Sequence, residues 1–414
     1  MLKVLVISDI HAYSKKQPKG REPSYVNYVS PTTDPSKNPV QGLRHLIHIR
    51  QVAVPDLVLC GGDLGHQAGP NAIEQVWTSL QSLKAEFQIS ELVSTTGNHD
   101  VDSRYKENKF DPRGFLKQLE PSFPFSRLDE SGRSFLEYWA NHFVIRSSDK
   151  YRLLIIDSTA FHGGGDTSTP EFVHGRISEY TIALIKERLN AELAQMASPP
   201  KINICLVHHH MQDDANEATA DVSVMKGGQL LVKLLSNPRY GNWVIVHGHR
   251  HRSMLYWGGT DTSGPLILSA GAFGATREYD YDNPSPNQFH MLNFELAPPA
   301  DLSPLLVGTM ESWTWSPPIG WVQATSGAGL PGHAGFGFRE QIPTLAAKVA
   351  ALVDDIPQRW AHLTGRMPQL RYLIPADLQA LLENLREFYG LHTELSINGL
   401  PFELARREGG HRGV

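Results

Sequence analysis

Five short clusters of carboxylate, amide and imidazole side chains are the residues of this sequence best suited to chemistry. Each cluster directly follows a run of apolar, mostly β-branched residues. The clusters are Asp9-Ile10-His11, Gly61-Gly62-Asp63, Gly97-Asn98-His99-Asp100, His208-His209-His210 and His247-Gly248-His249-Arg250-His251. Their oxygen and nitrogen atoms are ligands that divalent metal ions accept, and none of the clusters contains a cysteine. The pattern indicates a metal site without thiolate ligands.

Each cluster alone also fits a purely structural role. An aspartate after a strand is a common turn former, Gly97–Asp100 has the composition of a turn, and three successive histidines can belong to a solvated loop. Five clusters in order, each directly after a buried strand, do not fit that interpretation. Because the carboxyl ends of the strands of an open α/β sheet meet along one edge, we expect the five clusters to converge there.

The elements that must position these clusters alternate between strands and helices over residues 1–250. Apolar runs predict buried strands at Leu2–Ile7, Asp56–Cys60, Glu91–Thr95, Tyr151–Ile156, Ile202–Val207 and Trp243–Val246. Helical spacing of apolar residues predicts helices at Gly42–Ala53, Asn71–Phe87, Ser178–Met196 and Lys226–Leu235. This alternation predicts a layered α/β fold.

The pattern changes beyond Met254. Strands separated only by turns are predicted at Leu266–Leu268, Phe289–Phe294, Leu305–Trp313 and Trp321–Ala324, and their succession without helices suggests a second sheet. The tail is helical again, with helices predicted at Ile342–Asp354 and Ala376–Tyr389. The long polar segment Tyr13–Pro39 is expected to be a loop.

The composition and charge of the chain limit which class of protein it can be and which partners it can bind. The chain has 414 residues, of which 41% are hydrophobic and 20% charged, so it is expected to fold rather than to stay disordered. A net charge of −5 argues against a protein that coats nucleic acid nonspecifically, although nucleic acid stays an option as a substrate. Cys60 and Cys205 lie in strand-like runs and are expected to be buried thiols rather than a disulfide.

The sequence also suggests a compartment. It contains no apolar run near the ~20 residues that a membrane span needs. It opens on the strand pattern Lys3–Ile7, without the basic and apolar segments of a secretory signal. We therefore expect a cytoplasmic protein without a membrane partner.

The five clusters resemble the signature of the calcineurin-like metallophosphoesterases, which reads D-x-H, G-D, G-N-H-[DE], a strand-terminal H, and G-H-x-H. The resemblance covers residues 1–295. It implies that these residues form a catalytic domain with a calcineurin-like four-layer α/β/β/α sandwich. A strand-rich and Gly/Pro-rich extension (296–337) and a small, mainly helical C-terminal region (338–414) are expected to follow.

The resemblance also implies a centre of two divalent metal ions, drawn from Mn, Fe, Zn, Co or Ni. By the family's pattern one ion would be held by Asp9, His11, Asp63 and His251, and the other by Asp63, Asn98, His208 and His249, so that Asp63 bridges them. The triple histidine departs from the family, where a proline often stands at this strand end. His209 therefore stays an alternative to His208 as the ligand.

The family's mechanism assigns roles to the neighbouring residues. A hydroxide held between the two metals would attack phosphorus in line while His99 protonates the departing alkoxide, and Asp100 would orient the His99 ring. We assign His209 and Arg21 to substrate binding. Arg21 belongs to the loop 13–39, in which cations outnumber acids and which leaves directly from His11; a solvated loop without a ligand is the alternative.

Two further passages bear on the substrate. Asp157-Ser158-Thr159 and Gly175-Arg176-Ile177-Ser178 resemble the branch of the family that contains cyclic-nucleotide and other small-molecule phosphodiesterases. We therefore predict a phosphodiesterase, with a cyclic nucleotide among the expected substrates. A nuclease of the same fold acting on DNA or RNA, or a phosphoprotein phosphatase, are the alternatives. The C-terminal region is expected to bind a strand of nucleic acid or a protein partner.

Overall fold

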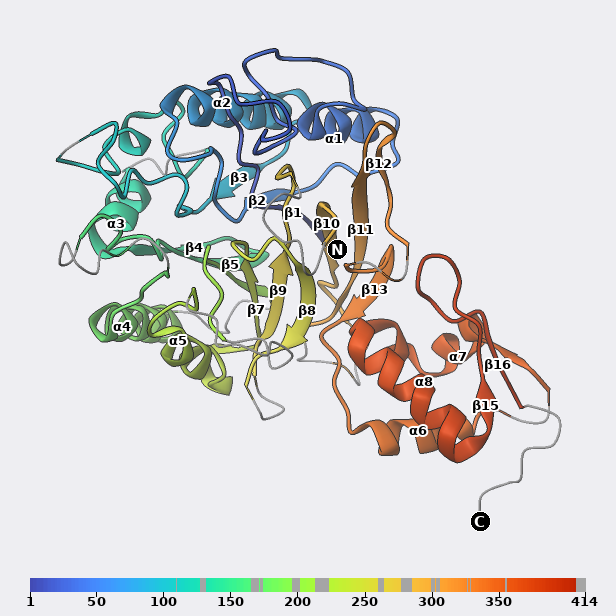
Figure 1. Cartoon of the computed structure of the whole chain (residues 1–414). Coiled ribbons are helices and arrows are strands. Elements are labelled where there is room, and N and C mark those ends of the chain that lie inside the picture. Colours follow the sequence, from blue (N-terminus) through green and yellow to red (C-terminus); the bar gives the residue numbers. More distant parts are fainter. Residues whose placement is uncertain are drawn as a thin grey trace.

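A computed structural model gives the fold of the chain (Figure 1). The structure describes residues 1–108, 110–126, 132–164, 171, 174–195, 202–212, 223–259, 264–276, 285–298, 302, 306–325, 327, 329–353 and 356–406. The predicted helix ends at Met196 and Asp354, and the tail beyond Arg406, lie outside the described residues.

The first sheet joins the beginning of the chain to strands far along it. Its strands, in spatial order, are β12 (Gly320–Gln323), β11 (Gly308–Ser316), β10 (Gln288–Phe294), β1 (Leu2–Ile7), β2 (Leu57–Cys60) and β3 (Glu91–Ser94), with β13 (His333–Phe336) also paired to β11. Strands β1, β2 and β3 run parallel, so their carboxyl ends lie at the same edge of the sheet.

The second sheet has the same arrangement in its centre. Its order is β4 (Phe143–Ser147), β5 (Tyr151–Ile156), β6 (Ile202–Leu206), β7 (Trp243–His247), β9 (Leu266–Ala270) and β8 (Ser253–Trp257). Strands β5, β6, β7 and β9 are parallel, which brings the carboxyl ends of β6 and β7 to one edge.

Helices cover the outer face of each sheet, and the two inner faces pack together. The helices α1 (Pro39–His48) and α2 (Pro70–Glu86) share an apolar core with the first sheet, and α4 (Glu179–Gln195) and α5 (Gly228–Leu235) share one with the second. Between the sheets, Val4, Leu59 and Val93 lie in one cluster with Leu153, Ile204 and Val246. The four-layer α/β/β/α sandwich is confirmed.

The strands beyond Met254 are arranged differently from the separate sheet that was predicted for them. They do not form a sheet of their own: β8 and β9 complete the second sheet, while β10, β11, β12 and β13 complete the first. The pairing of β10 with β1, in the register Leu2↔Phe294, joins residues from the two ends of this unit. Local sequence patterns carry no information about such distant pairing, which is why the strands could be predicted and their sheets could not.

Some boundaries also differ from those predicted. Helix α1 begins at Pro39 instead of Gly42, because the Asn38 side chain accepts hydrogen bonds from the amides of Val40 and Gln41 and caps the helix. It ends at His48 instead of Ala53, where Arg50 adopts a φ of 59°. The helix α3 (Arg133–Asn141) and the strand β4 were not predicted. Cys60 and Cys205 are buried free thiols, as predicted.

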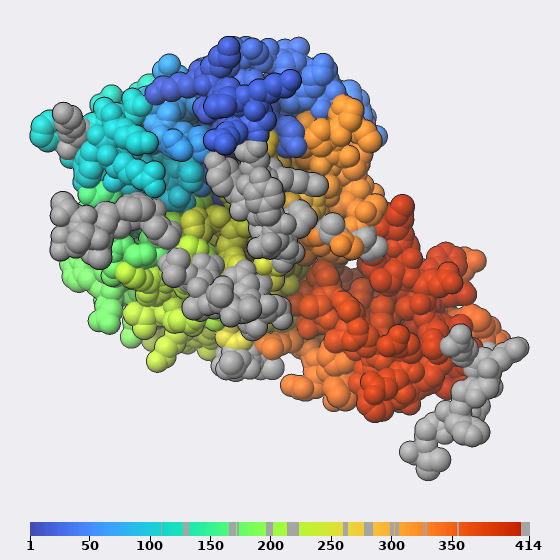
Figure 2. Space-filling model, in the orientation of Figure 1, coloured from blue at the N-terminus to red at the C-terminus, as the bar shows by residue number. Residues whose placement is uncertain are grey.

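The C-terminal residues form a separate small core beside the sandwich (Figures 1 and 2). The helices α6 (Ile342–Ala350), α7 (Trp360–Arg366) and α8 (Pro375–Tyr389) pack around Leu345, Leu363 and Leu381. Three short strands flank them in the order β14 (Gln358–Arg359), β16 (Glu403–Arg406) and β15 (Leu391–His392). Among the described residues, no helix has both the length and the apolar composition of a membrane-spanning segment.

Candidate metal centre

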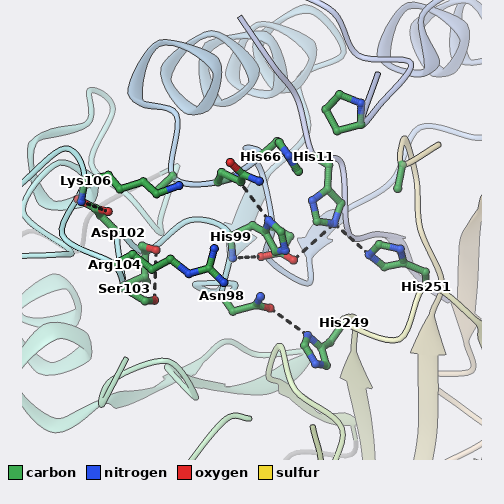
Figure 3. Close-up of a pocket in the computed structure, with 16 residues that line it drawn as sticks. His11, His66, Asn98, His99, Asp102, Ser103, Arg104, Lys106, His249 and His251 are labelled. Atoms are coloured by element: carbon green, nitrogen blue, oxygen red, sulfur yellow. Dashed lines mark hydrogen bonds and ion pairs between the residues drawn. The ribbon is translucent and has the colours of Figure 1, made fainter. Parts of the chain in front are cut away.

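The five sequence clusters meet at one edge of the sandwich, as expected from the parallel strands. Figure 3 labels His11, Asn98, His99, His249 and His251 at this edge. Asp9 and His11 follow β1, Asp63 follows β2, and Asn98 and His99 follow β3. From the second sheet, His208 follows β6, and His249 and His251 follow β7. The structure therefore brings together side chains that lie far apart in the sequence, such as His11 and His251, which are 240 positions apart.

One group of side chains surrounds His11. The Nε2 atoms of His11 and His251 lie 3.0 Å apart. His11 Nε2 is 3.5 Å from Asp63 Oδ2, and His251 Nε2 is 3.4 Å from Asp9 Oδ1. Ligand atoms of Asp9, His11 and His251 all lie within 4.8 Å of one another, which is close enough to hold one ion.

A second group surrounds Asn98. Its Oδ1 lies 2.9 Å from His208 Nε2 and 2.9 Å from His249 Nδ1. His208 Nε2 is also 3.4 Å from Asp63 Oδ2, the same carboxylate oxygen that His11 approaches. Asp63 thus stands between the two groups, in the position that a bridging ligand needs.

The orientation of the His208 ring fits a metal ligand. Its Nδ1 lies 2.7 Å from the carbonyl oxygen of Gly61, so Nδ1 carries the proton and donates it to that carbonyl. Nε2 faces Asp63 and Asn98, where its lone pair can hold a metal ion that replaces the Nε2 proton. Although burial opposes protonation of His208, the Asp63 carboxylate raises the pKa of this buried imidazole to about 9. This negative charge among buried nitrogen atoms is the environment in which a cation is stabilised.

The backbone is strained at these residues. Asp9, His11, Asp63, His249 and His251 adopt φ values between 50° and 71°, a region that costs free energy for residues other than glycine. Two glycines make the close packing possible. A Cβ at Gly97 would lie 2.1 Å from Asp63 Oδ1, and one at Gly248 would lie 2.4 Å from Asp9 Oδ2. Backbone strain of this kind concentrates at functional sites.

His99 lies in the wall of the same cavity, beside Asn98 (Figure 3). Its Nδ1 accepts a hydrogen bond of 3.4 Å from the amide of Gln67, and its backbone amide donates to Asp63 Oδ1 at 2.7 Å. Burial lowers the pKa of the His99 imidazole. The free Nε2 edge of the ring is therefore the part that can meet a substrate.

The Asp100 carboxylate does not lie where the prediction expected it, which was against the His99 ring. Its carboxylate accepts hydrogen bonds from the amides of Gly97 (2.9 Å) and Gly65 (3.1 Å), and so joins the loops after β3 and β2. Burial, with the nearby Asp63 carboxylate, raises the pKa of Asp100 to about 7. The contact that holds the His99 ring comes from Gln67 instead, so the role of Asp100 in orienting that ring stays a prediction.

The two residues assigned to substrate binding do not line this cavity. His209 is fully buried, with its Nδ1 2.8 Å from the hydroxyl of Ser158 and its ring centroid 4.4 Å from that of His249. Among the described residues, its Nε2 has no hydrogen-bond partner. Arg21 is exposed in the loop after β1, from which Pro23 reaches the cavity. Their roles in substrate binding stay predictions.

Sequence reasoning missed three residues of the cavity. The ring of His66 stacks on that of His99, with centroids 5.4 Å apart and planes at 25°. Arg104 and Lys106 extend into the cavity from the loop that follows β3 (Figure 3). His66 could have been found from the sequence, because it stands three positions after Asp63. Arg104 and Lys106 follow the third cluster, but their stretch has no periodic pattern of apolar residues that would have pointed to them.

Comparisons with known proteins agree with this geometry. The family model described as calcineurin-like phosphoesterase matches residues 2–253, and one described as wHTH-Calcineurin_assc, a calcineurin-associated winged helix–turn–helix, matches residues 334–387. No curated protein matches the chain.

Several solved structures match the chain at low identity. A dimetal phosphatase from Danio rerio is 11% identical over 78% of this chain and 98% of its own, with a TM-score of 0.47. PhoD is 10% identical over 79% of this chain and 72% of its own, with a TM-score of 0.40. GAP50, the anchor in the inner membrane complex of Plasmodium, is 10% identical over 78% of this chain and 88% of its own, with a TM-score of 0.39.

The first family model spans more than half of the chain and contains all five clusters, whose side chains the fold gathers into two groups of potential ligands around Asp63. The chain therefore belongs to the calcineurin-like phosphoesterases, and it is a hydrolase of phosphoric esters that depends on a binuclear metal centre, with a winged helix–turn–helix domain at its C-terminal end.

Proposed function

We propose that this chain is a phosphodiesterase that acts on a small molecule. The observation that supports this most directly is the cavity in front of the metal centre. It has a volume of about 360 Å³ and is lined by His11, Asp63, Asn98 and His99. Cavities of this size accommodate small molecules.

The ligand groups fit two divalent ions, held by Asp9, His11, Asp63 and His251 and by Asp63, Asn98, His208 and His249. Ions bound there would supply positive charge for the phosphoryl oxygens and would acidify a water molecule. His208 is fixed in the tautomer that such a site requires by its hydrogen bond to Gly61.

His99 is proposed to donate the proton to the departing alkoxide. His99 lines the cavity, and proton transfer from its imidazolium form would leave a neutral ring, whose Nδ1 can accept the Gln67 N–H. The stacked His66 ring holds the His99 plane from the other side. The side chain thus has one defined orientation before any substrate arrives, which is the condition for efficient general acid catalysis.

The winged helix–turn–helix match is the observation that would favour a nuclease. The exposed surface of α8 does not support this, because Glu383 and Glu387 stand beside a single arginine, Arg386. A helix that enters a groove of nucleic acid normally presents cations. Near the start of α8, Asp377 also bonds the sandwich through Trp257. We therefore assign this domain to contacts with protein.

The test is hydrolysis of bis-(p-nitrophenyl) phosphate with Mn, by the wild type and by His99→Ala. General acid catalysis contributes about 10²- to 10⁴-fold, so kcat is expected to fall by that factor while metal content is unchanged. Undiminished turnover in His99→Ala would remove His99 from the role. A wild type that hydrolyses phosphopeptides or DNA faster than any small diester would overturn the proposed substrate class.

A further inference from the structure

Two cations stand in the cavity wall on the side away from His249 and His251. Arg104 and Lys106 come from the loop that leaves β3 directly after the third cluster. Figure 3 shows the Arg104 guanidinium pointing toward Asn98 and the Lys106 side chain extending toward the same cavity above it. Neither residue belongs to the five clusters, so the metal centre does not account for them.

The loop is built in a way that presents these side chains. The carboxylate of Asp102 is buried and accepts three backbone hydrogen bonds, from Lys106 (2.8 Å), Glu107 (2.6 Å) and Asn108 (2.8 Å). The hydroxyl of Tyr105 donates to the carbonyl of Gly163 and ties the loop to the second sheet's side of the cavity. The loop therefore has a fixed shape, and its cations are positioned before a ligand binds.

The acids nearest to these cations are already engaged. Asp102 uses its oxygens on the backbone amides, and Glu107 pairs with Lys15 of the loop after β1 at 3.0 Å. Within the part of the chain that the structure describes, no carboxylate lies within ion-pair distance of the Lys106 ammonium. The Lys106 ammonium therefore brings a positive charge to this side of the cavity, which attracts an anionic group of a ligand.

We propose that Arg104 and Lys106 form a subsite for a second phosphate group of the substrate. This inference rests on the proposed function and narrows it: the substrate is a small phosphodiester that carries a further phosphate beside the bond that is cleaved. The guanidinium of Arg104 suits two oxygens of a phosphate, and the ammonium of Lys106 adds a point charge. Ions held by Asp63 and its neighbours would bind the diester, and the two cations would bind the second phosphate.

The test compares two diesters that differ by one phosphate. Thymidine 5′-(p-nitrophenyl phosphate) and the same compound with a 3′-phosphate release the same chromophore. The wild type is expected to prefer the 3′-phosphorylated compound by at least about tenfold in kcat/KM, since a hydrogen bond to a charged group contributes about that factor. Arg104→Ala and Lys106→Ala are expected to lose this preference, whatever their rate on the unphosphorylated diester.

Binding is measured separately from turnover. Calorimetry with thymidine 3′,5′-bisphosphate and thymidine 5′-monophosphate on the metal-loaded protein reports the subsite even for a chain that hydrolyses neither diester. Lys150→Ala is the control, because Lys150 is exposed in the turn between β4 and β5. Tighter binding of the bisphosphate that Arg104→Ala abolishes and Lys150→Ala preserves supports the subsite. Equal affinity of the wild type for both nucleotides, or a preference unchanged in Arg104→Ala, overturns it.

Discussion

The Nε2 atom of His208 and the Oδ1 atom of Asn98 lie 2.9 Å apart although their residues stand 110 positions apart in the sequence. His208 turns its other ring nitrogen to the Gly61 carbonyl, whereas the neighbouring His209 bonds Ser158 and lies behind the cavity wall. This geometry supports His208 as the metal ligand of the triple histidine.

Removing each histidine in turn tests that assignment. His208→Ala is expected to bind one manganese ion in place of two, because one ligand set then lacks a nitrogen donor and the other is intact. His209→Ala is the matched control and is expected to keep both ions. Metal content measured by mass spectrometry after dialysis decides between them. Full occupancy in His208→Ala together with loss in His209→Ala would reverse the two roles.

Asp63 is expected to matter more than any single histidine. Its Oδ2 lies 3.5 Å from His11 Nε2 and 3.4 Å from His208 Nε2, so it serves both ligand groups. Asp63→Ala is expected to bind neither ion, since both sites lose a ligand and the charge that offsets two dications. His251→Ala, which touches one group, is the comparison. Equal metal content in the two variants would contradict a bridging role for Asp63.

Gly97 tests how tightly the centre is packed. A methyl group there would lie 2.1 Å from Asp63 Oδ1, so Gly97→Ala must displace the carboxylate or the loop. We expect a loss of about 1–3 kcal/mol in the free energy of unfolding, together with weaker metal binding. Gly365→Ala is the control, because a Cβ at Gly365 in α7 meets nothing within 4 Å. Its stability is expected to rise by up to ~1 kcal/mol.

The sequence predicted which candidate ligands would meet, because of where they stand relative to strands. Asp9, Asp63 and His208 each follow a buried parallel strand, and the sheet edge then determines that they meet. The same reasoning could not find Arg104, because its loop has no periodic pattern and takes its shape from the Asp102 hydrogen bonds. It also assigned substrate binding to Arg21, which is not among the residues that line the cavity and whose role stays a prediction.

One of the contacts between the sandwich and the C-terminal domain is a part-buried hydrogen bond between Trp257 and Asp377. Trp257 Nε1 donates to Asp377 Oδ2 at 2.9 Å, and burial raises the pKa of that carboxyl group. Asp377→Ala is expected to weaken this link by about 1–3 kcal/mol, because the indole N–H loses its acceptor. Hydrogen exchange should then rise in α8 and stay unchanged in β1. Asp377→Asn keeps an acceptor oxygen, so hydrogen exchange in its α8 is expected to match that of the wild type. If α8 is equally protected from exchange in all three proteins, this hydrogen bond does not hold the C-terminal domain against the sandwich.

His290 is expected to give the sandwich a dependence on acid. Its Nε2 bonds the Ala270 carbonyl of the second sheet at 3.0 Å and its Nδ1 bonds Ser312 at 2.9 Å, while burial lowers its pKa to about 4. Between pH 6.5 and 4, His290 is therefore protonated in the unfolded chain, where its pKa is near 6.5, but stays neutral in the folded chain. The stabilisation is complete above pH 6.5 and is lost as the pH falls toward 4, by about 3 kcal/mol. In urea unfolding with metal chelated, the difference in stability between wild type and His290→Gln should shrink by that amount from pH 7 to pH 4; a difference that stays constant would mean that His290 does not titrate in this range.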